Sequence, residues 1–136
     1  MPNFTAVALT GFIAWTLFLL VLMEGIRSKL VLTKTLPANG FTPDNANLSH
    51  FMQRLARAHA NCLEGLPIFG GLMLVALTTD RAPVTDPLAF VLLGSRIVQS
   101  SIHLMSLSST AVTLRFLAFA VQMGIAVVWS VRLLLG

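Results

Sequence analysis

Long apolar runs separated by short polar segments dominate the chain. Residues 4–23 carry no charged side chain, and as a helix they would extend about 30 Å, which is the thickness of the hydrocarbon core of a bilayer. A second run begins within the segment Arg54–Pro67 and continues to about Leu77, a third covers residues 88–105, and a fourth covers residues 111–134. This pattern predicts four membrane-spanning helices.

Prolines, glycines and small polar residues mark the connections between these helices. Residues 34–49 contain two prolines and one glycine and form the main predicted loop, in which Asn47 or Ser49 is placed to cap the second helix. We expect residues 78–87 to form a short turn and residues 106–113 a brief loop. Because Pro67 lacks a backbone N–H, we expect it to kink or loosen the second span within a turn of Glu64.

The second span begins with a polar face. At about 100° per residue, Arg54, Arg57, Asn61 and Glu64 fall within an arc of roughly 80°, whereas His59 falls on a different face. Charged residues at membrane depth usually face a bundle interior or a wet cavity, where they find partners. The pattern therefore predicts an inward-facing polar site at this end of the second span.

The third span repeats the pattern. Arg96, Gln99 and His103 share one face of that helix. Two polar stripes inside apolar helices cost least when they face each other or a shared wet cleft. We expect Arg96 to pair with Glu64 within one protomer, and both a structural salt bridge and a catalytic role would explain that pair.

Two further arginines have alternative interpretations. Arg115 lies one turn inside the fourth span, which has no carboxylate, so its partner is a carbonyl, Asp44, Glu64, solvent at the membrane surface or an anionic ligand. Arg27 lies three residues after Glu24 and is placed to pair with it. For each arginine, extension of the side chain toward the interface and binding of a ligand stay open as alternatives.

Composition restricts the class of protein. The chain has 136 residues, of which 56% are hydrophobic and 10% charged, and its mean hydropathy is +0.84. These values indicate an integral membrane protein. The net charge of +4 comes from dispersed basic residues without a basic patch interleaved with aromatics, which argues against nucleic-acid binding.

Neither disulfide nor metal chemistry is indicated. The three histidines and the one cysteine show no ligand spacing, so we expect no metal site. Cys62 has no second cysteine to pair with, and it is either a small apolar helix residue or a thiolate activated by Arg57 and His59.

The distribution of basic residues predicts the orientation. With four spans, the first and third connections share one side of the membrane, and the second connection, residues 78–87, lies on the other. The first side holds Arg27, Lys29, Lys34, Arg54 and Arg57, and the second holds Arg81 and Arg132. The first side should therefore be cytoplasmic, with both termini outside. We see no internal repeat, and we expect a single domain over residues 1–136.

The segment Arg57-Ala-His-x-Asn61-x-x-Glu64-x-x-Pro67 resembles the signature of the MAPEG family, the membrane-associated proteins in eicosanoid and glutathione metabolism. The segment begins the second hydrophobic run, as it does in that family, and the four-span layout covers nearly the whole chain. The resemblance implies an all-α integral membrane protein, in which four transmembrane helices form a left-handed bundle. It also implies a homotrimer that holds glutathione between subunits. We expect a bacterial-type, multi-pass member in the inner membrane.

The resemblance also implies roles for individual residues. Arg57, Asn61 and Glu64 take the family's glutathione-contacting positions, and Arg115 is the candidate for the arginine that stabilises the thiolate. Gln99 and His103 stand where the better-known enzymes have tyrosines, and this chain contains no tyrosine. His103 could donate a hydrogen bond or take a proton there. Glutathione needs cations for its carboxylates, an acid for its amine and positive charge near its sulfur. The candidate binding residues are Arg54, Arg57, Asn61, Glu64, Arg96 and Gln99.

Two classes of function remain. The first is a glutathione-dependent transferase or peroxidase that acts on lipophilic small molecules from the membrane lipid. The second is a non-catalytic protein of the same fold that binds glutathione or a lipid head group. Arg57, Asn61 and Glu64 favour the first class, and the absence of tyrosine favours the second.

Overall fold

Helices form almost the whole chain. The structure, a computed structural model, describes residues 3–136. Its elements are α1 (Phe4–Leu32), α2 (His50–Gly65), the π-helical turn η1 (Leu66–Gly70), α3 (Gly71–Thr78), α4 (Ala82–Met105) and α5 (Ser109–Leu135).

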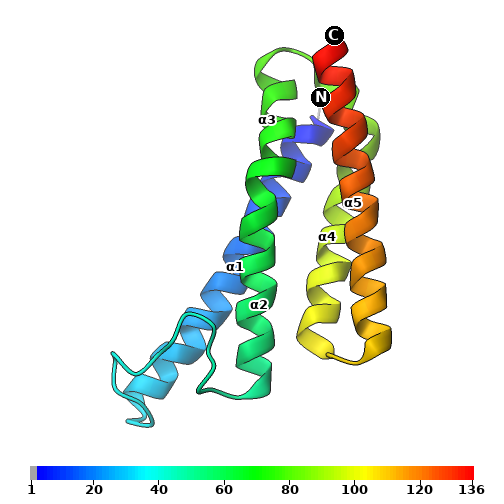
Figure 1. Ribbon diagram of the computed structural model, residues 1–136. Coiled ribbons are helices and arrows are strands. Elements are labelled where there is room, and N and C mark those ends of the chain that lie inside the picture. The colour runs from blue at the N-terminus through cyan, green and yellow to red at the C-terminus, as the bar shows by residue number, and fades with distance from the viewer. Residues whose placement is uncertain (1–2) are drawn as a thin grey trace.

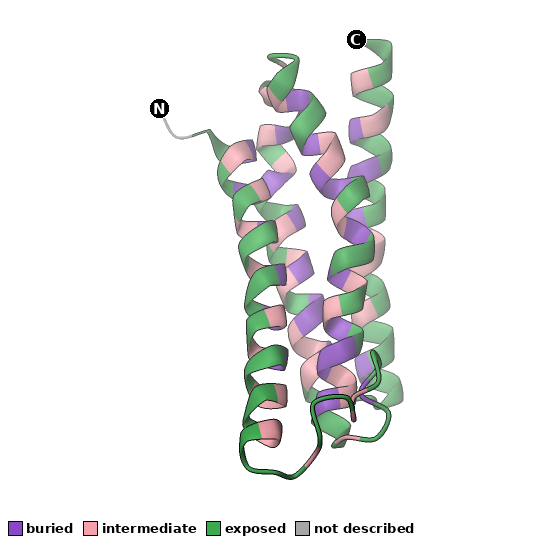
Figure 2. Cartoon of the chain, turned by 90° about the vertical axis from the view of Figure 1, so that its left-hand side faces the viewer, coloured by how far each residue is buried: buried purple, intermediate pink, exposed green. Residues whose placement is uncertain are grey.

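Four rods run up and down along a common axis (Figure 1), and α2, η1 and α3 together form the second of them. Each rod is long and apolar enough to cross a membrane, as the apolar runs predicted. Buried residues lie where the rods contact one another, and exposed residues cover their outer faces (Figure 2). Many of the exposed residues are large and apolar, which is the surface that a lipid environment requires.

Side-chain caps fix the start of three rods. Asn3 accepts a hydrogen bond from the backbone N–H of Ala6 at 3.1 Å. Ser49, one of the two predicted caps, accepts from Met52 at 3.2 Å and begins α2, and Ser108 begins α5 in the same manner. Each cap supplies an acceptor for a backbone N–H that has no partner inside the helix.

The predicted turn at residues 78–87 is wrong in its second half. The turn ends at Arg81, and α4 already begins at Ala82, so that Pro83 and Pro87 lie inside the helix. Pro83 belongs to the first turn, where a missing N–H leaves no gap in the hydrogen bonding. The predicted disturbance at Pro67 is present as the π-helical turn Leu66–Gly70.

Two apolar clusters form the core. One contains Phe12 of α1, Phe69 of η1 and Trp129 of α5. The other contains Leu19 of α1 and Leu55 of α2. The helices thus bury small stripes of their surface against each other, and Arg96, Gln99, His103 and Gln122, described below, lie on these buried stripes.

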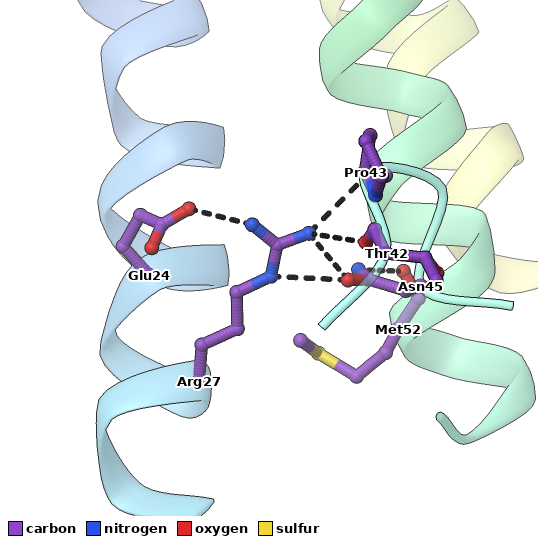
Figure 3. A network of polar contacts seen from close by, with 6 residues as sticks. All are labelled: Glu24, Arg27, Thr42, Pro43, Asn45 and Met52. Carbon is purple, nitrogen blue, oxygen red and sulfur yellow. Dashed lines mark hydrogen bonds and ion pairs between the residues drawn. The ribbon is translucent and has the colours of Figure 1, made fainter. Parts of the chain in front are cut away.

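The long connection between α1 and α2 is attached to α1 by Arg27 (Figure 3). Its guanidinium pairs with Glu24 at 2.9 Å, as the spacing predicted. The remaining donors bind the connection: Nε and Nη2 donate to Asn45 Oδ1 at 3.0 and 2.5 Å, and Nη2 also donates to the carbonyl of Thr42 at 3.2 Å. Asn45 in turn donates to the carbonyl of Met52 in α2 at 2.7 Å. Arg27 therefore attaches the connection to α1 through its side-chain hydrogen bonds.

At the opposite end, charged residues near the start of α4 cap neighbouring rods. Asp86 Oδ1 accepts a hydrogen bond from the backbone N–H of Thr5, in the first turn of α1, at 3.0 Å. Arg81 donates to the carbonyls of Leu133 and Arg132, in the last turn of α5, at 2.7 Å each. An anion at a helix N-terminus and a cation at a C-terminus both match the helix dipole. These contacts attach α4 to the ends of α1 and α5.

Candidate functional site

A shallow hollow lies between α2 and α4. It has a volume of about 270 Å³ and is lined by Arg57, Ala60, Asn61 and Glu64 of α2 and by His103 of α4. The spacing of three, four and seven residues places the α2 side chains on one face of that helix. Arg57 and Glu64 are exposed, and within residues 3–136 Glu64 forms no ion pair.

Asn61 joins the hollow to the interior. Its Oδ1 atom accepts hydrogen bonds from Arg96 Nη1 at 2.5 Å and from Gln99 Nε2 at 3.2 Å. The expected pairing of Arg96 with Glu64 is therefore wrong. Arg96 is fully buried, and α2 turns Asn61 toward α4 while Glu64 remains exposed.

Aromatic rings surround the buried cation. The guanidinium carbon of Arg96 lies 5.4 Å from the ring centroid of Phe12, 5.6 Å from that of Phe69 and 5.9 Å from that of Phe119. The Nε and Nη2 atoms have no hydrogen-bond partner within the described residues. Ring faces attract a cation electrostatically, which offsets part of the cost of removing Arg96 from water.

A second buried amide lies behind Gln99. Gln122 of α5 is fully buried, and its Nε2 atom donates to Gln99 Oε1 at 2.9 Å and to the carbonyl of Ala118 at 3.2 Å. A continuous path of polar groups therefore crosses three rods, from Asn61 in α2 through Gln99 in α4 to Gln122 in α5.

Arg54 and Cys62 do not line the hollow. Arg54 donates through Nε to the carbonyl of Leu104, in the last turn of α4, at 2.9 Å. Cys62 is fully buried, and its Sγ atom lies 3.1 Å from the Oγ atom of Ser100. This placement favours the interpretation of Cys62 as a small buried residue. Within residues 3–136, His, Cys, Asp and Glu side chains form no group that could hold a metal ion.

His103 and Arg115 each have an unsatisfied nitrogen. His103 Nδ1 and Arg115 Nε are buried and have no hydrogen-bond partner in the described part of the chain. Arg115 lies near Arg57 and His103. In the described part of the chain neither Arg57 nor Arg115 forms an ion pair, and Glu64 is the single carboxylate that lines the hollow. The two arginines therefore give the hollow an excess of positive charge, which favours an anion.

A model of the MAPEG family matches residues 5–135. The chain belongs to the MAPEG family. No curated protein and no solved structure matches it. This MAPEG protein is accordingly a multi-pass membrane protein of a type associated with glutathione and eicosanoid metabolism, as the signature at Arg57–Pro67 suggested.

The structure separates the predicted site residues of this MAPEG protein into groups. Those around the hollow are Arg57, Asn61, Glu64 and His103. Arg96 and Gln99 lie behind Asn61 and reach the hollow only through it. Arg54 is bonded to a carbonyl at the end of α4, and Arg115 lies near the hollow without lining it.

Sequence reasoning missed two features of this MAPEG site. The sequence could have indicated Gln122 as a buried polar residue, because it is an amide in the middle of the charge-free part of the fourth apolar run. It could not have indicated that Phe12, Phe69 and Phe119 surround a cation, since phenylalanine in an apolar helix is equally consistent with contact with lipid.

Proposed function

We propose that this MAPEG protein binds glutathione in the hollow and uses it to conjugate or reduce lipophilic small molecules that enter from the bilayer. The observation that carries the proposal is the order of groups along α2. An exposed cation, an amide and an exposed carboxylate follow one another at Arg57, Asn61 and Glu64. This order fits a ligand that has carboxylates, peptide groups and an amine.

Arg57 and Asn61 would hold the acidic and peptide parts of glutathione, and Glu64 would receive its amine. Glutathione would supply a thiol as the nucleophile. Arg115 and His103 are the groups proposed to face the sulfur. The unsatisfied Arg115 Nε and His103 Nδ1 support this assignment, because a cation or a hydrogen-bond donor beside a thiol favours its thiolate form.

We further propose that the functional unit is a homotrimer with a hollow at each subunit interface. Arg57 and Glu64 are exposed on a single chain, although charged groups in a membrane protein usually face protein or a wet cavity. A second subunit against this face would cover them and exclude lipid. The mass of the protein in mild detergent tests this point, and a strictly monomeric species would contradict it.

Binding is tested by titration calorimetry with reduced glutathione in detergent. Glu64→Gln should weaken binding by roughly tenfold to a hundredfold, because hydrogen bonds to charged groups contribute about 1.5 to 3 kcal/mol. The matched control is Asp80→Asn, which removes a carboxylate from the turn at the opposite end of the bundle and should leave binding unchanged. The absence of binding at millimolar glutathione would refute the proposal.

Thiolate formation is tested separately by ultraviolet absorbance on adding glutathione near neutral pH. The parent should generate thiolate absorbance, and Arg115→Ala should reduce it. Binding without thiolate would favour the second candidate, a non-catalytic glutathione-binding protein. The absence of tyrosine from the chain supports that candidate.

A further inference from the structure

The orientation of the Asn61 side chain decides what the hollow offers to a ligand. An asparagine amide has an acceptor oxygen on one side and a donor NH₂ group on the other. Arg96 donates to Asn61 Oδ1 at 2.5 Å, and an arginine has no acceptor that could bind the NH₂ group instead. The oxygen must therefore face Arg96. This leaves Nδ2, which has no hydrogen-bond partner within residues 3–136, on the side of the hollow.

A second constraint reaches the same result from α5. The backbone carbonyl of Ala118 can only accept, so Gln122 must turn its Nε2 atom toward it, at 3.2 Å. The same Nε2 atom donates to Gln99 Oε1 at 2.9 Å, which leaves Gln99 Nε2 to donate to Asn61 Oδ1 at 3.2 Å. Reversing any one of these amides would bring two oxygens or two NH₂ groups together.

We propose that Asn61 determines ligand specificity as a donor-only contact, held in one orientation by Arg96 directly and by Gln122 through Gln99. The proposal rests on the proposed function of the hollow. It specifies that the ligand presents an acceptor oxygen, from a carboxylate or a peptide carbonyl, to Asn61. A ligand that presents a hydroxyl hydrogen or an ammonium group there meets N–H groups that cannot accept it. Arg96, Gln99 and Gln122 are positioning residues, because none of them lines the hollow.

The orientation can be measured without a ligand. Selective ¹⁵N labelling of asparagine and glutamine side chains, with the Asn61 signal assigned by its loss in Asn61→Asp, reports how fast each NH₂ group exchanges with water. The Asn61 NH₂ should exchange with water faster than the NH₂ groups of Gln99 and Gln122, which are buried and should be protected. Protection of the Asn61 NH₂ as strong as that of Gln99 would overturn the proposal.

The ligand arm replaces the donor with an acceptor of the same shape. Asn61→Asp keeps an oxygen for Arg96 and Gln99 but turns a second oxygen toward the hollow. Ala60→Asp is the matched control, because it brings the same charge to the same hollow and leaves the amide intact. Asn61→Asp should weaken glutathione binding about tenfold more than Ala60→Asp does, without a lower unfolding temperature than the parent. Equal losses from the two variants would overturn the proposal.

A third experiment tests whether Arg96 and Gln99 position Asn61. Both residues donate a hydrogen bond to Asn61 Oδ1, so either one can hold the amide in its orientation. Either Arg96→Met or Gln99→Met leaves one donor on Asn61 Oδ1, whereas the double variant leaves none. The loss of affinity in the double variant should exceed the product of the single losses by about tenfold, which is the signature of coupled residues. Losses that multiply would assign Arg96 and Gln99 a merely structural role. If the parent does not bind glutathione, the proposed function fails, and the NH₂ exchange rates still decide the orientation of Asn61.

Discussion

Arg96 is a buried cation with no carboxylate partner among residues 3–136. In that part of the chain its guanidinium forms one hydrogen bond, to Asn61, and otherwise faces the rings of Phe12, Phe69 and Phe119. The planar guanidinium is weakly hydrated and stacks on aromatic faces, which the compact and strongly hydrated ammonium of lysine does less well. The chemical identity of the cation therefore matters more at this position than its charge.

Arg96→Lys should destabilise the protein more than Arg96→Met. Lysine keeps a charge to be desolvated but loses the flat contact with the rings, and a buried charge without its partner costs about 3 kcal/mol. Methionine fills similar space without a charge and should remain within about 1 kcal/mol of the parent. Thermal unfolding of the three proteins in one detergent gives the order, and a methionine variant less stable than the lysine variant would contradict this account.

Asp44 gives a second prediction, outside the spans. Thr42 Oγ1 donates to Asp44 Oδ1 at 2.8 Å, and the backbone N–H of Ala46 donates to the same atom at 3.1 Å. These bonds, that of Thr42 first, hold the pKa of the Asp44 carboxyl below its ordinary value of 3.8. The folded loop prefers the charged form. Its contribution is therefore present above pH 3.8 and is lost as the pH falls through the lowered pKa.

A carboxyl NMR titration of Asp44 measures this shift. Thr42→Val removes the hydroxyl donor and should raise the midpoint back toward 3.8. Thr35→Val, in the same loop but without a bond to Asp44, should leave the midpoint where it is. An unchanged midpoint in Thr42→Val would show that the hydroxyl is not the main cause.

At the scale of elements, apolar periodicity predicted the number and order of the spans, because crossing a bilayer requires long uninterrupted apolar helices. Periodicity did not predict the residues at which the helices begin and end. The prolines of residues 78–87 suggested a turn, yet Pro83 lies in the first turn of α4 and Pro87 lies inside the helix. Because proline is compatible with a helix start, the presence of Pro83 could not separate a turn from a beginning helix.

Gly65 shows how closely α2 packs against α4. A Cβ atom at this position would lie 2.7 Å from Arg96 Nη2 and 3.0 Å from the ring of Phe69. The backbone of α2 therefore passes directly beside the guanidinium. By contrast, a Cβ atom on Gly71, at the start of α3, would have no neighbour within 4 Å.

Gly65→Ala should cost about 1 to 3 kcal/mol of stability, because the added methyl group overpacks the region around Arg96. Gly71→Ala is the matched control. It should leave stability unchanged or raise it by about 0.5 to 1 kcal/mol, since alanine loses less backbone entropy in a helix. Unfolding in detergent compares the two variants, and equal effects would contradict the close approach at Gly65.

For the whole molecule, helical periodicity was enough to place Arg57, Asn61 and Glu64 on one face, and the structure gathers them around the hollow. Their role in binding stays a prediction. Periodicity could not identify the partner of Arg96, because helix rotation and side-chain rotamers decide which atoms meet. The contact between Gln99 and Gln122 joins two rods, and no pattern within one rod contains it.

The two ends of the bundle differ in their number of basic residues, and this difference predicts the orientation in the membrane. The connection of residues 33–49 and the short link before α5 lie at one end, and the turn of residues 79–81 lies at the other (Figure 1). Basic residues are concentrated near the first end, which should face the cytoplasm.

Labelling of single cysteines in a Cys62→Ser background tests this orientation. Asn39→Cys and Leu107→Cys should react with an impermeant reagent from the cytoplasmic side, and Thr79→Cys from the other side. All three positions are exposed. Reaction of the first two from opposite sides would contradict the four-span fold, whereas reaction of both from the outer side would contradict only the orientation.

The three phenylalanines around Arg96 are translated at different times during synthesis of the chain. When α4 leaves the ribosome, Phe12 and Phe69 have already been made, but Phe119 belongs to α5, the last rod. The same rod carries Gln122, which fixes Gln99. The third span therefore enters the bilayer with an arginine whose surroundings are incomplete. Because the following span completes them, we expect the stable insertion of α4 to depend on sequence that is translated after it.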